Sequence, residues 1–207
     1  LLGKKSQSGF YKTELTPDWQ KIRKVIDPET LEYTEAQPVE LPCLEEAKKA
    51  KTLPEKMRAV VYGEDKGARF VWKAVANNLI YAANRIPEIS DTIVDIDNAM
   101  RWGFNWELGP FEMFDAIGVG RFVKRAEQDG VKIPEALREI ERFYRFSEQG
   151  AKEYYDVSSR SYKPMALPAG EVDLQILKRS NRVVEKNANS SVIDLGDGVF
   201  CLEFHSK

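Results

Sequence analysis

The segment that most constrains the fold is RWGFNWELGPFEMFDAIG, residues 101–118. It holds two tryptophans, three phenylalanines and three glycines in eighteen residues. Pro110 follows Gly109, and proline is favoured in the first turn of a helix because its φ is already helical. Helical spacing then places three apolar side chains on one face: Phe111, Phe114 and Ile117. The segment therefore predicts a short helix in a tightly packed corner.

The rings of this segment allow a second interpretation, in which they stack on a flat ligand. They are Trp102, Phe104, Trp106, Phe111 and Phe114. Gly103 is expected to end the preceding helix in the left-handed conformation. Glycine also lets a helix end approach another backbone closely. The packed corner is favoured for this reason, and the ligand pocket stays open as an alternative.

Further helices are expected on both sides of this corner. Residues 54–86 are helical and apolar nearly all round, as in a helix buried among others, until Pro87 ends the run. Three later helices are expected. One runs from a cap at Ser90 or Asp91 to about Trp102, and another covers Arg121–Gln128. Pro134 opens the third, whose inward side chains are Leu137, Ile140 and Tyr144. Residues 54–163 are thus expected to form one helical domain, and the fold class predicted is mainly α, a helical bundle with a short C-terminal β-hairpin.

The flanking segments have a different character. Residues 13–53 are rich in proline and charge and are expected to be a linker with short helices, at Pro17–Val25 and Leu44–Ala50. Residues 151–163 are expected to be irregular or a short hairpin. A second linker, 164–190, would hold a short helix near Leu174–Ser180. Residues 191–204 predict a hairpin around Gly196-Asp197-Gly198, because such turns favour positive φ.

Composition limits the classes of function. The 207 residues carry 31 basic and 33 acidic side chains, so no basic excess indicates nucleic acid or an anionic membrane. No apolar run approaches the ~20 residues that span a bilayer. Two cysteines, Cys43 and Cys201, make neither a disulfide framework nor a zinc site, which favours a cytoplasmic location. The polar start without Met or signal peptide leads us to expect a piece of a longer chain.

Catalytic candidates are few. The single histidine, His205, lies near the C-terminus, where fraying would leave it a poor general base or metal ligand. Glu112 and Asp115 could act as acid and base, but a charge-matched helix start is the favoured interpretation. Glu107 is expected to be solvated. We assign no catalytic, cofactor-binding or metal-binding residue to this chain.

A glycine pair and three asparagines each allow more than one interpretation. GVGRFV, residues 118–123, contains a GxG, but a dinucleotide fingerprint needs a preceding strand and a third glycine. A helix break at Gly118 and Gly120 is favoured. The asparagines Asn77, Asn78 and Asn84 on a mostly apolar helix could cap a neighbouring helix or face a cleft if buried, and this is left open.

The segment AMRWGFNWELGPFEMFDAIGVGRF, preceded by ISDTIVDID, resembles the C-terminal helical domain of 3-hydroxyacyl-CoA dehydrogenases. The matching positions are Asp97, Ala99, Gly103, Gly109, Pro110, Phe111, Glu112, Asp115 and Gly118. GKKSQSGFYK resembles the closing tail of the same family, with Gln7 in place of the usual glycine. SVIDLGDGVFCLEFHSK resembles the first hairpin of the enoyl-CoA hydratase (crotonase) fold.

The resemblance implies a fused enzyme of fatty-acid β-oxidation. Residues 1–12 would be the tail of a first helical domain, 54–163 a second copy, and 191–207 the start of a truncated crotonase-like domain. The parent would oxidise 3-hydroxyacyl-CoA with NAD and hydrate enoyl-CoA, with its catalytic groups outside this chain. The chain itself would be structural, its second copy imitating the family's dimer through the apolar faces of 66–86 and 93–102.

Two alternatives remain open. One is an independent binding module for acyl-CoA or a protein partner, using Trp106 and its neighbours. The other is an autonomous enzyme using Glu112 and Asp115. The partners expected are neighbouring domains of the parent and its acyl-CoA substrate, but neither nucleic acid nor membrane. A second copy of the chain is an open alternative.

Overall fold

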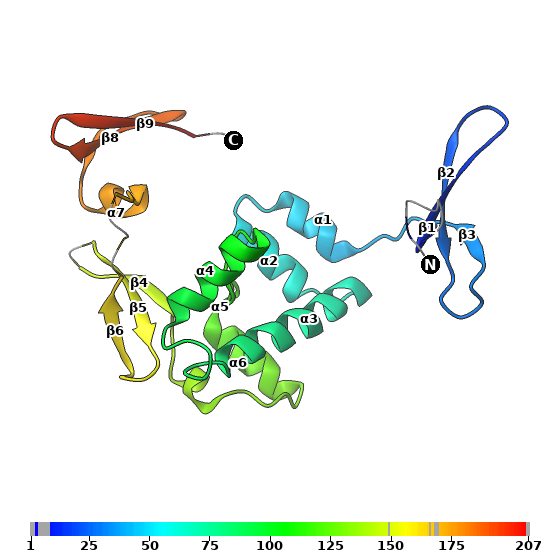
Figure 1. Cartoon of the computed structure of the whole chain (residues 1–207), viewed down its shortest axis with the longest axis horizontal. Helices are drawn as coiled ribbons and strands as arrows, with labels where there is room; N and C mark the ends of the chain where they lie inside the picture. The colour runs from blue at the N-terminus through cyan, green and yellow to red at the C-terminus, as the bar shows by residue number, and fades with distance from the viewer. Residues whose placement is uncertain (1–2, 4–8, 149, 166, 168–169, 206–207) are drawn as a thin grey trace. The chain divides into compact units, whose positions relative to one another are not determined.

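The computed structural model describes residues 3, 9–148, 150–165, 167 and 170–205. The chain divides into two compact units, Leu1–Leu41 and Pro42–Lys207. Figure 1 labels the helices and strands of both units. The part of the GKKSQSGFYK resemblance that falls on residues 4–8, and the end of the C-terminal one at 206–207, lie outside the described residues.

The first unit is a three-stranded antiparallel sheet, called sheet A, with the order β1-β2-β3. Its strands are β1 (Tyr11–Leu15), β2 (Lys21–Ile26) and β3 (Tyr33–Glu35). The helix predicted at Pro17–Val25 is wrong, because Pro17 lies in the β1–β2 turn. Thr16 Oγ1 accepts the main-chain N–H of Gln20 at 3.0 Å and closes that turn.

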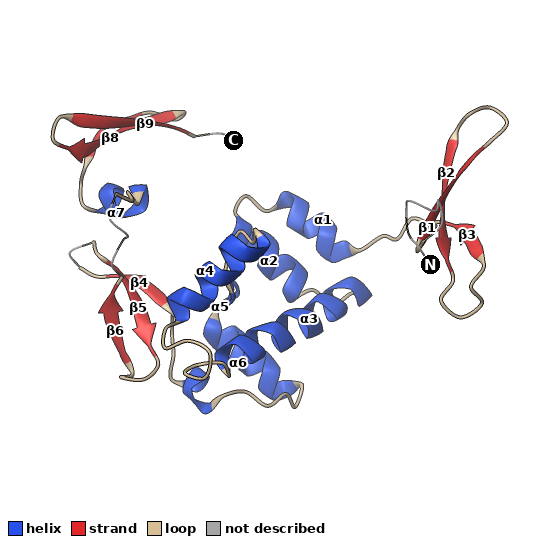
Figure 2. Cartoon of the chain, in the orientation of Figure 1, coloured by secondary structure: helices blue, strands red, loops and turns tan. Residues whose placement is uncertain are grey.

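The second unit begins with six helices, drawn blue in Figure 2. They are α1 (Pro42–Lys49), α2 (Leu53–Val61), α3 (Lys66–Ala83), α4 (Ile93–Phe104), α5 (Pro110–Ile117) and α6 (Val119–Gln128). Capping residues set their starts: Thr52 and Glu55 form a capping box on α2, and Asp65 caps α3. The predicted helical run of residues 54–86 is therefore two helices, and α3 ends at Ala83 before Pro87 is reached.

The rest of the second unit is mainly β. After the 3₁₀ turn η2 (Glu135–Arg138), the elements are β4 (Tyr144–Phe146), β5 (Lys152–Asp156), β6 (Ser161–Pro164), α7 (Leu174–Arg179), β7 (Val183–Lys186), β8 (Ser190–Gly196) and β9 (Val199–Phe204). They form two more antiparallel sheets: sheet B, β4-β5-β6, and sheet C, β7-β8-β9. The predicted C-terminal hairpin and the helix near Leu174–Ser180 are confirmed. The helix predicted after Pro134 is only the 3₁₀ turn, and Tyr144 begins a strand.

The predicted fold class, mainly α, is wrong. Of the residues that the structure describes, 39% lie in helices and 23% in strands, and the strands form three antiparallel sheets of three strands each. The sequence misled because the strands are short and half exposed. In YKTEL of β1, the apolar Tyr11 and Leu15 alternate with the charged Lys12 and Glu14, as in a strand, but the run is only five residues long and its apolar side chains are the exposed ones.

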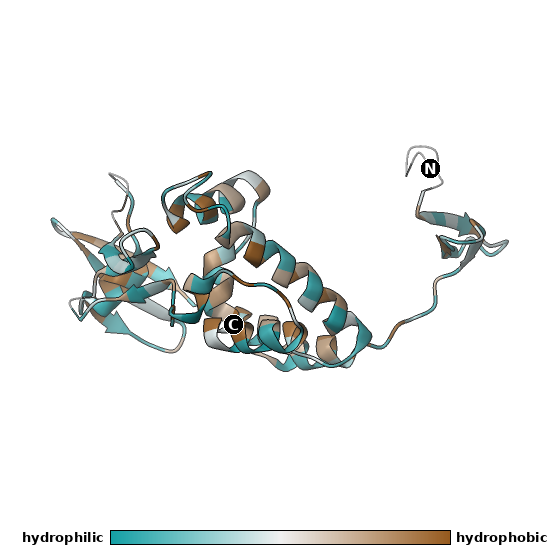
Figure 3. Cartoon of the chain, turned by 90° about the horizontal axis from the view of Figure 1, so that it is seen from below, coloured by the Kyte–Doolittle hydropathy of each residue, from teal (hydrophilic) through white to brown (hydrophobic). Residues whose placement is uncertain are grey.

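The helices nevertheless supply most of the core. Rings from four segments pack edge to face or tilted: Phe114 lies 4.9 Å from Phe122 and 5.2 Å from Phe143, and Trp72 lies 5.3 Å from Phe122 between centroids. In Figure 3, brown apolar and teal polar residues alternate along the helices, as expected for amphipathic helices around a shared core.

Candidate functional site

The resemblance motif forms the junction between α4, α5 and β4. Asp97 lies on the inward face of α4, four residues after the buried Ile93, and only 2% of its surface is exposed. Thr92 caps the start of α4, accepting the main-chain N–H of Asp95 at 3.2 Å. Asn105, in the left-handed conformation, ends the helix where Gly103 was predicted to do so. The chain then turns so that α5 begins directly against Asp97.

Gly109 is the point of closest approach. A Cβ atom at this position would lie 2.4 Å from the Cα, Cβ and Cγ of Asp97. Ordinary van der Waals contacts between carbons lie near 3.5–4.0 Å, so no side chain fits here. The glycine of the GPFE motif is therefore required by packing. Its φ of −74° is available to any residue.

The carboxylate of Asp97 caps α5. Its Oδ1 accepts the main-chain N–H of Phe111 at 2.8 Å, and its Oδ2 accepts that of Glu112 at 3.1 Å. The hydroxyl of Tyr144 donates to the same Oδ2 at 2.8 Å. These three donors join α4 to the first turn of α5 and to β4. The Asp97 side chain of α4 thus accepts main-chain N–H groups in the first turn of α5, which have no partner within their own helix.

Glu112 and Asp115, the pair considered as acid and base, are also used by the backbone. Glu112 Oε2 accepts the N–H of Gly109 at 2.9 Å, and its Oε1 lies 3.4 Å from Arg101 Nη1. Asp115 accepts the N–H of Phe143 and that of Tyr144, each at 2.8 Å. We call Asp97, Glu112 and Asp115 the carboxylate cluster.

Burial shifts the acidity of this cluster. It raises the pKa of Asp97 to about 7, although the hydrogen bonds from Phe111 and Tyr144 oppose the rise. It likewise raises the pKa of Asp115 to about 6 against the N–H donors of Phe143 and Tyr144. Raised carboxyl pKa values occur at catalytic sites and also in buried structural networks. Here five main-chain N–H groups donate to the three carboxylates, so the geometry is that of a structural joint.

The rings of the motif divide into two groups. Phe111 and Phe114 are at most 1% exposed and lie in the core, as the packed corner predicts. Trp102 and Phe104 are 73% and 70% exposed, so for these two rings that prediction is wrong. Trp106 is half-buried. The five rings do not gather into one pocket.

Other predictions concern α3. Asn77, Asn78 and Asn84 are all exposed, so the buried asparagines considered from sequence do not occur. The apolar face of 66–86, which was expected to contact the first copy of the domain, faces inward instead. Trp72 and Leu79 on this face are buried in this unit's own core, at 3% and 0% exposure, and cannot make that contact.

Gly118 and Gly120 do not form a dinucleotide loop. Gly118, with φ of +90°, lies between the C-terminus of α5 and the N-terminus of α6. Gly120 lies inside α6 and does not break it. A helix rather than a strand precedes the GxG, so the pyrophosphate cradle of the dinucleotide fold does not fit here.

His205 is held in sheet C. Its Nε2 lies 2.9 Å from Ser191 Oγ and 3.3 Å from Glu203 Oε2, and Glu203 is bound by Lys178 at 2.6 Å. A catalytic triad needs the two different ring nitrogens of histidine for the nucleophile and the acid. Since one nitrogen faces both groups, this trio lacks that arrangement. Within the described residues, no three His, Cys, Asp or Glu side chains could together hold a metal ion.

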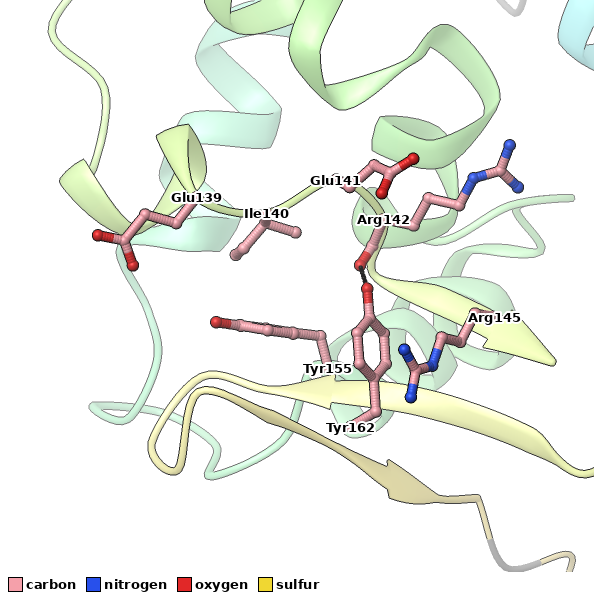
Figure 4. Close-up of a pocket in the computed structure, with 7 residues that line it drawn as sticks. All are labelled: Glu139, Ile140, Glu141, Arg142, Arg145, Tyr155 and Tyr162. Atoms are coloured by element: carbon pink, nitrogen blue, oxygen red, sulfur yellow. Dashed lines mark hydrogen bonds between the residues drawn. The ribbon is translucent and has the colours of Figure 1, made fainter. Parts of the chain in front are cut away.

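A recess of about 290 Å³ lies where the loop after η2 meets sheet B. Figure 4 shows Ile140 and Tyr155 on opposite sides of it and the Tyr162 hydroxyl donating to the carbonyl of Arg142, at 2.7 Å. Arg145 lies 3.6 Å from the Tyr162 ring centroid and is paired with Glu153 at 2.7 Å. The side chains of Arg145 and Tyr162 at this recess are thus already engaged by neighbouring groups. The volume of the recess is at the lower limit for a ligand site.

Comparison with known proteins supports the motif assignment. Residues 69–157 match the family model described as 3-hydroxyacyl-CoA dehydrogenase, C-terminal domain. This range contains the carboxylate cluster and most of α3, and it confirms the resemblance of the GPFE segment to the C-terminal helical domain of 3-hydroxyacyl-CoA dehydrogenases. No solved structure matches the chain significantly.

Three curated relatives align with the chain. A Bacillus subtilis protein named "Probable 3-hydroxyacyl-CoA dehydrogenase" is 42% identical over all of this chain and 26% of its own length. Two proteins named "Putative fatty acid oxidation complex trifunctional enzyme" match more distantly. The one from Rickettsia felis is 26% identical over 78% of the chain and 20% of its own length. That from Rickettsia prowazekii is 27% identical over 66% of the chain and 18% of its own length. The chain thus spans about a quarter or less of these relatives.

The described residues contain no helix with both the length and the apolar character needed to cross a bilayer.

Proposed function

We propose that this chain is a segment of a longer 3-hydroxyacyl-CoA dehydrogenase of fatty-acid oxidation and that its own task is assembly rather than catalysis. The observation that carries the proposal is the carboxylate cluster. Its residues lie inside the matched range of the dehydrogenase domain, yet their oxygens cap α5 and fix the start of β4. Acidic residues used in this way support a helical scaffold.

The parent enzyme would oxidise 3-hydroxyacyl-CoA with NAD in the cytoplasm. The cofactor would bind a nucleotide-binding domain elsewhere in the parent, because the GxG of this chain follows a helix rather than a strand and its second glycine lies inside α6. The name of the Bacillus subtilis relative supports the dehydrogenase activity, and those of the Rickettsia relatives support a multidomain parent. Residues 1–12 would be the tail of a preceding helical domain, and 191–207 the start of a crotonase-like domain.

The assembly surface would be the exposed stripe of α3. Four exposed residues recur along this helix at positions three and four apart: Phe70, Ala74, Asn77 and Tyr81. The two rings are 74% and 61% exposed, and the residues between them are small. A large aromatic at each end of a small-residue stripe suits close contact with another helix. The preceding helical domain of the parent is the occupant we propose.

The experiment replaces the rings rather than the core. A Phe70→Ser, Tyr81→Ser variant of the parent should lose the contact between its two helical domains, measured as a loss of resistance to limited proteolysis. A Lys73→Ser variant on the same helix is the matched control and should behave as wild type. The thermal midpoint of the 207-residue chain should change little in either, because these side chains are exposed. Unchanged assembly of the ring variant would exclude this surface.

Catalysis is tested separately. The isolated chain should not turn over 3-hydroxyacyl-CoA with NAD, whereas the parent should. Turnover by the isolated chain that is lost in Glu112→Gln would favour the autonomous enzyme and refute the assembly role.

A further inference from the structure

The two faces of sheet A differ in charge. In an antiparallel pair, residues directly opposite one another lie on the same face. The register pairs Thr13 with Arg23 and Leu15 with Lys21. We call the face formed by Tyr11, Thr13, Leu15, Lys21, Arg23 and Val25 the basic face, because it holds two cations and none of the carboxylates of the three strands.

The opposite face carries matched charges. Glu14 lies 2.8 Å from the ammonium of Lys12 and 2.5 Å from that of Lys24. The hydrogen bonds from these two lysines lower the pKa of Glu14 to about 2 and keep it ionised at neutral pH. Both lysines of that face therefore have a carboxylate partner within the sheet.

The cations of the basic face lack such a partner. Among the residues that the structure describes, neither Lys21 nor Arg23 forms an ion pair. Residues 1–8, LLGKKSQS, contain no acid, so they add no carboxylate to this face. Positive charge on the basic face is thus available to an external anion.

Each of these cations lies directly beside an apolar side chain. The guanidinium of Arg23 is 4.0 Å from the centroid of the Tyr11 ring, and Leu15 lies directly opposite Lys21. Tyr11 and Leu15 are each 56% exposed. Together with Thr13 and both cations they line a groove of about 870 Å³. A ligand that fits this groove must carry acidic and apolar groups close together.

The spacing of the two cations points to an extended peptide. Lys21 and Arg23 lie two residues apart on β2, so their side chains leave the same face about 7 Å apart. Alternate residues of an extended peptide have the same spacing, and two acids placed in this way match the two cations. The next alternate position lies beside Val25 and the Tyr11 ring, where an apolar side chain fits. The residues in between face away from the sheet.

We propose that the basic face of sheet A binds an extended acidic peptide segment whose alternate residues are acid, acid and apolar. Lys21 and Arg23 donate charge-assisted hydrogen bonds to the two carboxylates, and the apolar side chain packs on Tyr11. This surface belongs to the first unit and does not depend on the assembly role proposed for α3.

Single-stranded nucleic acid also combines anionic groups with flat apolar ones. Its affinity for a protein grows with the number of phosphates that cations neutralise, and the basic face has only two cations. Its bases also need exposed aromatic rings on which to stack, whereas Arg23 already covers one side of the Tyr11 ring. The acidic peptide is therefore the better match.

The test titrates the isotope-labelled 207-residue chain with a capped pentapeptide, leucine-serine-glutamate-serine-glutamate, and with the same sequence reversed, and follows the main-chain amides by NMR. One of the two peptides should bind and shift the amides of sheet A. Its affinity should fall as salt is raised, because the contacts are exposed. Lys21→Gln and Arg23→Gln should each weaken binding by about tenfold.

Controls separate the groove from general charge effects. Lys24→Gln, next to Arg23 but on the opposite face, is the matched control and should leave binding unchanged. A peptide with lysine in place of both glutamates should not bind, and one with serine in place of leucine should bind more weakly. The amide spectrum of each variant also shows whether sheet A is still folded.

Several results would overturn the inference. They are unshifted sheet A amides at about 10 mM of either peptide, a concentration that nearly saturates a site with a dissociation constant of about 1 mM, or equal weakening by Lys24→Gln and Arg23→Gln. Tighter binding of an oligouridylate of about ten nucleotides would assign the face to nucleic acid instead. Each of these outcomes leaves the contact tested by Phe70→Ser, Tyr81→Ser unaffected, so the two proposals fail separately.

Discussion

Replacing Gly109 by alanine tests whether the junction of α4 and α5 depends on close backbone approach. The added Cβ would lie 2.4 Å from three atoms of Asp97, one of them the Cα. A flexible side-chain end could move aside, but the Cα of a helix residue cannot. The two helices must therefore separate by on the order of 1 Å to restore an ordinary carbon contact.

The cost has two parts. Overpacking of a well-filled site costs about 1–3 kcal/mol and occasionally more. Separation also stretches the hydrogen bonds from Phe111 and Glu112 to Asp97, now at 2.8 and 3.1 Å. Each bond to a charged group contributes about 1.5–3 kcal/mol. We expect Gly109→Ala to lower the free energy of unfolding by at least about 3 kcal/mol, a large share of the ~5–15 kcal/mol typical of a domain.

Gly103→Ala is the matched control, because both glycines belong to the same motif. A Cβ at Gly103 meets nothing within 4 Å, and the residue lies inside α4. Alanine is favoured over glycine in a helix by about 1 kcal/mol, so this variant should be as stable as wild type or more so. Urea unfolding followed by circular dichroism at 222 nm measures both. If Gly109→Ala unfolds at the urea concentration of wild type, the close-approach argument is refuted.

Three further substitutions probe the same core. Burial raises the pKa of Asp97 to about 7, so between pH 4 and 7 the folded chain binds more protons than the unfolded one. The free energy of unfolding should therefore fall as pH rises through that window, by up to about 4 kcal/mol. In Asp97→Asn, the urea concentration at the unfolding midpoint should depend less on pH than in wild type. An unchanged pH dependence would show that another group causes it. Tyr144→Phe removes the hydroxyl donated to Asp97 at 2.8 Å and should cost about 1–3 kcal/mol; a calorimetric midpoint equal to wild type would contradict this. Trp72→Phe removes the indole N–H donated to Asp129 at 2.6 Å and should cost about 1–3 kcal/mol in urea unfolding, whereas a smaller effect than that of Lys73→Ser would argue against a structural role for this bond.

The sequence predicted those elements whose boundaries are set by local chemistry. Pro110 at the first turn, followed by apolar residues at helical spacing, makes α5 recognisable from its own sequence. The break between α2 and α3 was missed although its signals were present. Asp65, whose side chain accepts the N–H of Ala68, is a capping residue directly before an apolar run.

Elements that depend on tertiary context were not predicted. The strands of sheet A alternate exposed and half-buried side chains, but several of the half-buried ones are charged. Lys12 and Lys24 occupy such positions because both pair with Glu14 across the strands. A pattern of apolar residues cannot reveal this arrangement, since the ion pairs exist only after the strands align. The exposure of Trp102 and Phe104 had no sequence signal either, because apolar side chains at a helix end are usually buried.

Asp97 shows how a sequence pattern can suggest chemistry that the structure explains otherwise. The acids of the motif invite an acid–base interpretation, and the pKa of Asp97 is raised as at many active sites. Yet this carboxylate accepts three donors from the chain's own backbone and Tyr144. Both oxygens of Asp97 thus take part in the joint that holds α4, α5 and β4 together. Folding alone therefore accounts for an acid at position 97.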